Sequence, residues 1–170
     1  MKIYFSHGKE SGPWGTKIKR LAKIAEGMGC AVESVDYTDL MDPGLRVEHL
    51  LEALAREEDR FVLVGSSMGG YVSLVASETV KPEAIFLMAP ALYMPGYEGQ
   101  QYHSRSSHIE IVHGWSDDVI PPENSIRYAK EGGHTLHLIS GDHALNSSIQ
   151  LVADLFVQFL ERARGSRSSC

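Results

Sequence analysis

The feature that most constrains this chain is the segment 61–70, which reads Phe-Val-Leu-Val-Gly-Ser-Ser-Met-Gly-Gly. Its apolar first half is typical of a buried strand, and the apolar residues after Gly70 predict a helix. The spacing Gly65-x-Ser67-x-Gly69 between them fits a nucleophile elbow, a sharp strand-to-helix turn with a serine at its apex. A serine held in such a strained turn leaves no room for Cβ atoms two residues before and after it. The alternatives are a glycine-rich turn that binds nothing and one that cradles a phosphate.

Length and composition set limits on the class of protein. The 170 residues suffice for one domain with a sizeable core, and 43% hydrophobic with 22% charged residues is ordinary for a globular protein. The formal net charge of −6 argues against a nucleic-acid-binding surface, which would be basic. Two cysteines, Cys30 and Cys170, give no disulfide framework, so we expect a reducing, cytoplasmic location. The chain leads straight into a predicted strand and has no long apolar run, so we expect neither a signal peptide nor membrane contact.

Short apolar strands alternate with helical patterns along the chain. We predict strands at 2–6, 31–37, 60–65, 84–89, 109–113 and 135–139. We predict helices at 16–28, from 43 onward, from 68 to about 79, from 122 to about 130, and from about 144 to 160. This alternation predicts a three-layer α/β/α sandwich with a mostly parallel sheet of about six strands. Residues 90–107 should form a long loop, and residues 161–170 a disordered tail after a single domain at 1–160.

The loops at the carboxyl ends of the predicted strands are where a parallel sheet binds its ligands. A serine hydroxyl is a poor nucleophile and needs an adjacent base. His143, directly after the last predicted strand, is the candidate base. Asp117 or Asp118, after the fifth strand, would hold the imidazole in the required tautomer. The chain order is therefore Ser67, then Asp117 or Asp118, then His143.

Acyl transfer also needs two N–H donors for the oxyanion of its tetrahedral intermediate. The backbone N–H of Met68 is one candidate, because it follows the serine at the start of a helix. The backbone N–H of Lys9, in the His-Gly-Lys turn after the first strand, is the other. Aromatic side chains in these loops, among them Tyr93, Tyr97 and Trp115, either line a substrate pocket or pack over the sheet. The sequence leaves both interpretations open.

Four segments of the chain resemble the α/β-hydrolase superfamily, and the resemblance covers nearly the whole sequence. They are Ser6-His7-Gly8, Gly65-x-Ser67-x-Gly69, His113-Gly114-x-x-Asp117-x-x-Ile120-Pro121 and Gly141-Asp142-His143. Within the superfamily the chain is most similar to short hydrolases such as the small YqiA-type esterases. The resemblance implies a minimal α/β-hydrolase fold without a cap domain. It also implies that the triad acid is Asp117, four residues after the histidine, and that the His-Gly turns serve loop structure.

The combination predicts a carboxylesterase-like serine hydrolase that cleaves small carboxylic esters through Ser67, His143, Asp117 and an acyl-enzyme. A thioesterase or amidase with the same triad is an alternative, as is a non-catalytic binding protein with this fold. The histidines have no metal-site spacing, so we expect neither a metal nor an organic cofactor. The expected partner is a small-molecule ester, with no nucleic acid and no membrane, and the oligomeric state stays open.

Overall fold

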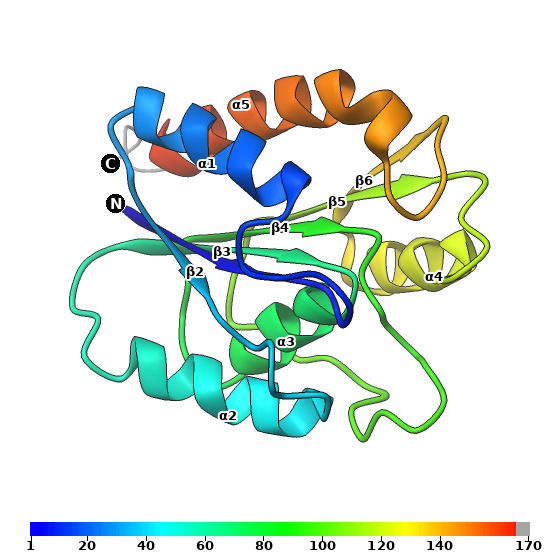
Figure 1. Ribbon diagram of the computed structural model, residues 1–170, viewed down its shortest axis with the longest axis horizontal. Coiled ribbons are helices and arrows are strands. Elements are labelled where there is room, and N and C mark those ends of the chain that lie inside the picture. Colours follow the sequence, from blue (N-terminus) through cyan, green and yellow to red (C-terminus); the bar gives the residue numbers. More distant parts are fainter. Residues whose placement is uncertain (166–170) are drawn as a thin grey trace.

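The computed structural model describes residues 1–165, and it is a sheet covered by helices on both faces (Figure 1). The six strands are β1 (Lys2–Ser6), β2 (Ala31–Val35), β3 (Phe61–Ser66), β4 (Ala84–Met88), β5 (Ile109–Gly114) and β6 (Thr135–Ile139). The α-helices are α1 (Thr16–Gly27), α2 (Pro43–Leu54), α3 (Met68–Ala76), α4 (Pro122–Gly132) and α5 (Ile149–Gly165), the last preceded by the 3-10 helix η1 (Asn146–Ser148). The predicted three-layer α/β/α sandwich is confirmed.

The strand order in the sheet is β2-β1-β3-β4-β5-β6, and every neighbouring pair is parallel. After β1 the chain adds β2 on one side and then returns to add β3 on the other. The sheet therefore has a topological switch point between β1 and β3. Helix α1, which follows β1, lies on one face, and α3, which follows β3, lies on the other (Figure 1). Connections that leave in opposite directions open a crevice at the carboxyl ends of the strands, which is where such folds bind ligands.

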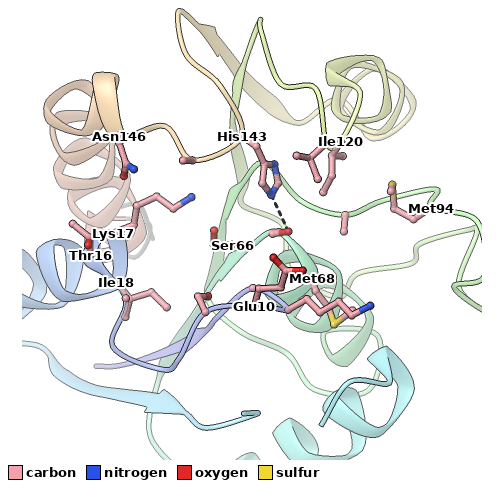
Figure 2. A pocket seen from close by; sticks show the side chains of 18 of the residues that line it. Glu10, Thr16, Lys17, Ile18, Ser66, Met68, Met94, Ile120, His143 and Asn146 are labelled. Atoms are coloured by element: carbon pink, nitrogen blue, oxygen red, sulfur yellow. Dashed lines mark hydrogen bonds between the residues drawn. The ribbon is translucent and has the colours of Figure 1, made fainter. Parts of the chain in front are cut away.

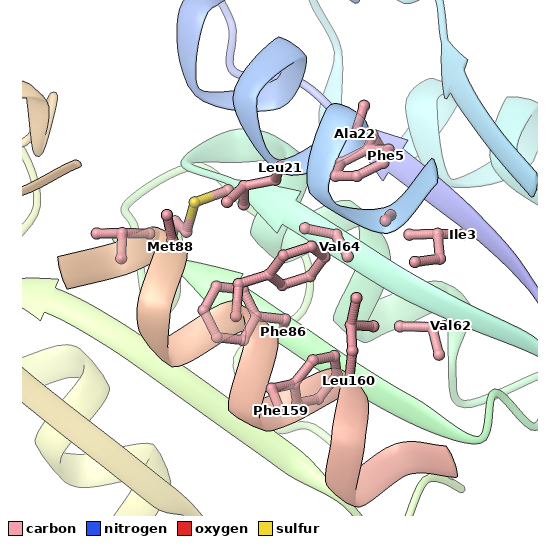
Figure 3. Close-up of a cluster of buried hydrophobic side chains, with 14 of the residues drawn as sticks. Ile3, Phe5, Leu21, Ala22, Val62, Val64, Phe86, Met88, Phe159 and Leu160 are labelled. Atoms are coloured by element: carbon pink, nitrogen blue, oxygen red, sulfur yellow. The ribbon is translucent and has the colours of Figure 1, made fainter. Parts of the chain in front are cut away.

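Both faces of the central strands are apolar because both are covered. In β3, Val62 and Val64 pack under α1 and α5, whereas Leu63 between them packs on the opposite side with the core beneath α2, α3 and α4. Figure 3 shows the first of these cores, where Phe86 of β4 meets Phe159 of α5. This double burial explains why the strands read as unbroken apolar runs rather than as alternating patterns.

The last helix differs from its prediction at both ends. Leu145 fits the apolar stripe of the predicted helix and is fully buried, but its φ of 57° is left-handed. The Asp142 carboxylate accepts the Leu145 N–H at 3.0 Å and holds a turn there, so the α-helix begins at Ile149. The helix then continues through Gly165, so residues 161–165 are not part of a tail as predicted. The rest of the predicted tail, residues 166–170, lies outside the described residues.

Candidate active site

The turn between β3 and α3 places Ser67 at the carboxyl edge of the sheet. Ser67 has φ 56° and ψ −121°, a conformation that costs a residue with a side chain about 1–3 kcal/mol. Both neighbouring glycines are required by close backbone approach. A Cβ on Gly65 would lie 2.3 Å from the carbonyl oxygen of Gly69, and a Cβ on Gly69 would lie 2.0 Å from that of Ser6 in β1. The packing of the elbow against β1 thus fixes where the serine hydroxyl points.

A hydrogen-bond chain links the three predicted polar residues. His143 Nε2 lies 3.1 Å from Ser67 Oγ, the contact drawn as a dashed line in Figure 2. His143 Nδ1 lies 2.7 Å from Asp117 Oδ2. Because a carboxylate can only accept, Nδ1 carries the proton and Nε2 is free to accept from the serine hydroxyl. The structure therefore brings the serine, the imidazole and the carboxylate together in the order that nucleophile activation requires.

The carboxylate that bonds His143 belongs to Asp117, whereas Asp118 is exposed to solvent. Asp117 is buried, and its Oδ1 accepts the backbone N–H groups of Val119 and Ile120 at 2.9 and 2.8 Å. Burial alone would raise the pKa of Asp117, but the hydrogen bonds from Ile120, His143 and Val119 outweigh burial and lower it. Asp117 is thus ionised at neutral pH and can stabilise a positive charge on His143.

A second histidine, for which the resemblance implied only a role in loop structure, supports the same carboxylate. His113 is fully buried at the end of β5, and its Nε2 lies 3.0 Å from Asp117 Oδ2 and 3.0 Å from the carbonyl oxygen of Ile120. Its Nδ1 lies 2.7 Å from the hydroxyl of Ser125 in α4, which can donate to it. Burial lowers the pKa of His113, which keeps the ring neutral. The spacing of four residues before Asp117 was the available signal for this contact.

The loop after β1 is held by a buried arginine. Arg46 of α2 is fully buried, and its Nη1 donates to the carbonyl oxygens of His7 and Gly8, both at 3.1 Å. In a trans peptide the C=O and the following N–H point in opposite directions. The Gly8 carbonyl faces Arg46, so the Lys9 N–H points away from Arg46, and Lys9 is one of the residues that line the cavity over Ser67. Among residues 1–165 the Lys9 N–H has no hydrogen-bond acceptor, and the Met68 N–H, at the start of α3, has no acceptor within its helix.

A cavity of about 530 Å³ lies directly over Ser67. Its walls come from the loop after β1, the start of α1, the elbow, the loop after β4 and the segment around His143 (Figure 2). Of the predicted pocket residues, Tyr97 lines this cavity together with Met94. Tyr93 instead lines a second cavity of about 360 Å³ beside α4, and Trp115 is 60% exposed and lines neither of the two. Of the three aromatic residues for which the sequence left a pocket role open, only Tyr97 therefore lines the cavity over Ser67.

Two further properties of residues 1–165 concern cofactors and membranes. Nowhere in this range do three or more histidine, cysteine, aspartate or glutamate side chains gather in a way that could hold a metal ion. None of the helices in the same range has the length and hydropathy that crossing a bilayer requires.

Solved structures with this fold come from several organisms. A member of the α/β-hydrolase superfamily from Xanthomonas campestris pv. campestris is 32% identical, with a TM-score of 0.86, over 94% of this chain and 98% of its own. Est1E from Butyrivibrio proteoclasticus is 17% identical, with a TM-score of 0.82, over 96% of this chain and 88% of its own. A lidless α/β serine hydrolase from Xanthomonas campestris is also 17% identical, with a TM-score of 0.71, over 95% and 81% of the two chains.

Sequence comparison places the chain in a family. No curated protein shows significant similarity to it. The model of the uncharacterised protein family UPF0227 matches residues 1–102, a range that includes the loop after β1 and the elbow. The chain therefore belongs to the family UPF0227 and, by its fold and its 32% identical neighbour, to the α/β-hydrolase superfamily.

Proposed function

We propose that this chain is a serine hydrolase that cleaves small carboxylic esters. Ser67 is the nucleophile, His143 the general base and acid, and Asp117 the group that orients His143. The observation that carries the proposal is the unbroken hydrogen-bond chain from Asp117 through His143 to Ser67 at the wall of a cavity. A binding protein with a misaligned triad would not need the 3.1 Å contact between His143 Nε2 and Ser67 Oγ.

The geometry supports a two-step reaction. Ser67 Oγ attacks the ester carbonyl carbon while His143 Nε2 takes the hydroxyl proton. The carbonyl oxygen becomes an oxyanion that the N–H groups of Lys9 and Met68 stabilise. The C–O bond to the alcohol then breaks, and His143 gives its proton to the leaving alkoxide. Water repeats the sequence on the acyl-enzyme and releases the acid, which restores Ser67.

The cavity favours small substrates. Its volume of about 530 Å³ lies in the range that holds small molecules, and its walls combine apolar side chains with the polar atoms of the site. Ile18, Met94 and Val119 supply apolar surface for an acyl chain or an alcohol. We therefore expect short-chain esters to be better substrates than long-chain ones. Parallel assays on matched esters, thioesters and amides would show which of the three bonds is cleaved best.

Labelling with a fluorophosphonate tests the assignment of the nucleophile. The reagent should modify wild-type protein at Ser67, and Ser67→Ala should abolish both the label and ester hydrolysis. Ser66→Ala is the matched control, because it removes the adjacent hydroxyl and should still be labelled. His143→Ala should reduce turnover by about three orders of magnitude or more, since the members of a triad act as a unit. Labelling that persists in Ser67→Ala would refute the proposal.

A further inference from the structure

A lysine side chain enters the same cavity from α1, and the proposed chemistry does not use it. Lys17 is the second residue of α1 and lines the cavity together with Ser67 and His143. In Figure 2 its side chain extends from the helix into the cavity, with the amine on the side that faces His143. The amine therefore lies where part of a bound substrate would lie.

The ammonium of Lys17 has no partner of opposite charge at contact distance. Within residues 1–165 its Nζ makes no hydrogen bond or ion pair, and the two carboxylates whose charge acts on it, Asp117 and Asp142, already accept other bonds. Burial lowers the pKa of Lys17, and these two carboxylates only partly oppose that shift. A partly desolvated charge without a counterion costs free energy. Such an arrangement is more typical of a binding site than of a structural ion pair.

The other charges around the cavity do not cancel this ammonium. Lys9 and Glu10 both line the cavity and are both exposed to solvent, so their opposite charges offset each other and leave that of Lys17 in place. The start of α1 also faces the cavity through Gly15 and Thr16. That helix has no side-chain N-cap and no acidic residue in its first turn, so the partial positive charge of its first N–H groups adds to that of Lys17.

We propose that Lys17 is a specificity-determining residue that binds an anionic group, a carboxylate or a phosphate, carried by the ester substrate. The inference rests on the proposed function, because the anion is recognised while the ester carbonyl lies at Ser67. The oxyanion of the reaction has its own donors in the N–H groups of Lys9 and Met68. Lys17 enters from the α1 wall, so it serves a second negative charge, separated from the carbonyl by the acyl chain or the alcohol.

The test compares matched ester pairs that differ only in charge. One series consists of 4-nitrophenyl monoesters of dicarboxylic acids with four to eight carbons, and the other of 4-nitrophenyl esters of monocarboxylic acids of the same lengths. A third arm uses 4-nitrophenyl esters of phosphonoalkanoic acids, which separates phosphate-like from carboxylate recognition. Spontaneous hydrolysis is subtracted in each case. The variants are Lys17→Met, which keeps the length of the side chain, and Lys17→Arg, which keeps its charge. Lys19→Met on the exposed side of α1 is the matched control.

The expected result is a preference of the wild-type protein for one of the anionic series at a defined chain length. Lys17→Met should lower kcat/KM for that ester by about 10- to 100-fold, mainly through KM, with the neutral ester changed by less than about threefold. Lys17→Arg should restore most of the preference, and Lys19→Met should behave as wild type. Equal losses on charged and neutral esters, or no preference at any length, would overturn the inference.

Three readouts separate this inference from the proposed function. Fluorophosphonate labelling of Ser67 and turnover of neutral esters report the function alone, and both should persist in Lys17→Met. Calorimetric binding of glutarate and of inorganic phosphate reports the anion site without any turnover. Wild-type protein that is labelled and active, yet shows neither binding nor charge preference, refutes the role of Lys17 only. Protein that binds an anion through Lys17 but is neither labelled nor active refutes the hydrolase proposal.

Discussion

Replacing Asp117 by asparagine gives the most detailed test of the site, because four hydrogen-bond donors converge on this carboxylate. Its Oδ1 accepts two backbone N–H groups, from Val119 and Ile120. Its Oδ2 accepts the Nδ1–H of His143 at 2.7 Å and the Nε2–H of His113 at 3.0 Å. An asparagine side chain has the same shape but only one acceptor oxygen, so its NH₂ group must face one of these two pairs of donors.

If the asparagine keeps its amide oxygen on the N–H groups of Val119 and Ile120, His143 can no longer act as the general base. The NH₂ group of the asparagine then faces His143, which can accept from it only by moving its own proton from Nδ1 to Nε2. That proton points at Ser67 Oγ, and His143 can no longer accept the hydroxyl proton. We expect kcat to fall by about 10³- to 10⁴-fold with little change in KM. The opposite arrangement sets the NH₂ group against two backbone donors and disrupts the loop after β5.

The same substitution should reduce stability. The lowered pKa of Asp117 indicates that its partners favour the charged carboxylate in the folded protein. Loss of hydrogen bonds to a charged acceptor costs about 1.5–3 kcal/mol, measurable as a lower urea midpoint. Asp118→Asn is the matched control, because that side chain is exposed, and it should change kcat by less than about twofold. Folded Asp117→Asn that kept more than about a tenth of wild-type kcat, or a large loss in Asp118→Asn, would refute this role of Asp117.

Two further substitutions test the supports of the fold and the site. Burial raises the pKa of Glu110, but hydrogen bonds from two histidine rings and Arg162 outweigh it and lower the pKa to about 2. Because this lies below the unfolded value of about 4.3, Glu110 should contribute about 3 kcal/mol above that pH, lost as the pH falls toward 2. Urea unfolding of Glu110→Gln should lack this acid dependence, with exposed Glu161→Gln as control; an unchanged pH profile would contradict the assignment. Arg46→Met should lower kcat by about 100-fold, because the Lys9 N–H loses its orientation, and wild-type turnover in this variant would argue against that donor.

Local sterics and periodicity are the reasons that much of the architecture could be predicted. The strand, the two glycines and the helix around Ser67 belong to one short segment, and the backbone approach that excludes a Cβ at Gly65 comes from Gly69 itself. The unbroken apolar strands indicate burial on both faces, which requires helices on both sides of the sheet. The order of Ser67, Asp117 and His143 in the chain then assigns each of them to a loop at the same edge.

Other features depend on contacts that the periodicity of apolar residues does not reveal. Leu145 fits the helical stripe, yet the turn held by Asp142 places it before the helix while still burying it. Tyr93 and Tyr97 are close in sequence and similar in chemistry, but they line different cavities. The loop after β4 has no regular secondary structure, so the sequence spacing of its residues does not predict which way each side chain points.

The sequence by itself determined that a serine stands at a strained strand-to-helix turn, because that turn requires glycines two residues before and after the serine, and Gly65 and Gly69 stand there. Chain order alone left Asp117 and Asp118 open, and the tertiary structure shows which of them meets His143, because the turn at 117–120 buries one and exposes the other. Only the tertiary structure placed the guanidinium of Arg46 beneath the loop after β1 and the amine of Lys17 in the cavity. In each case the physical reason is the same: burial and partner choice arise from packing between distant segments, which local patterns do not specify.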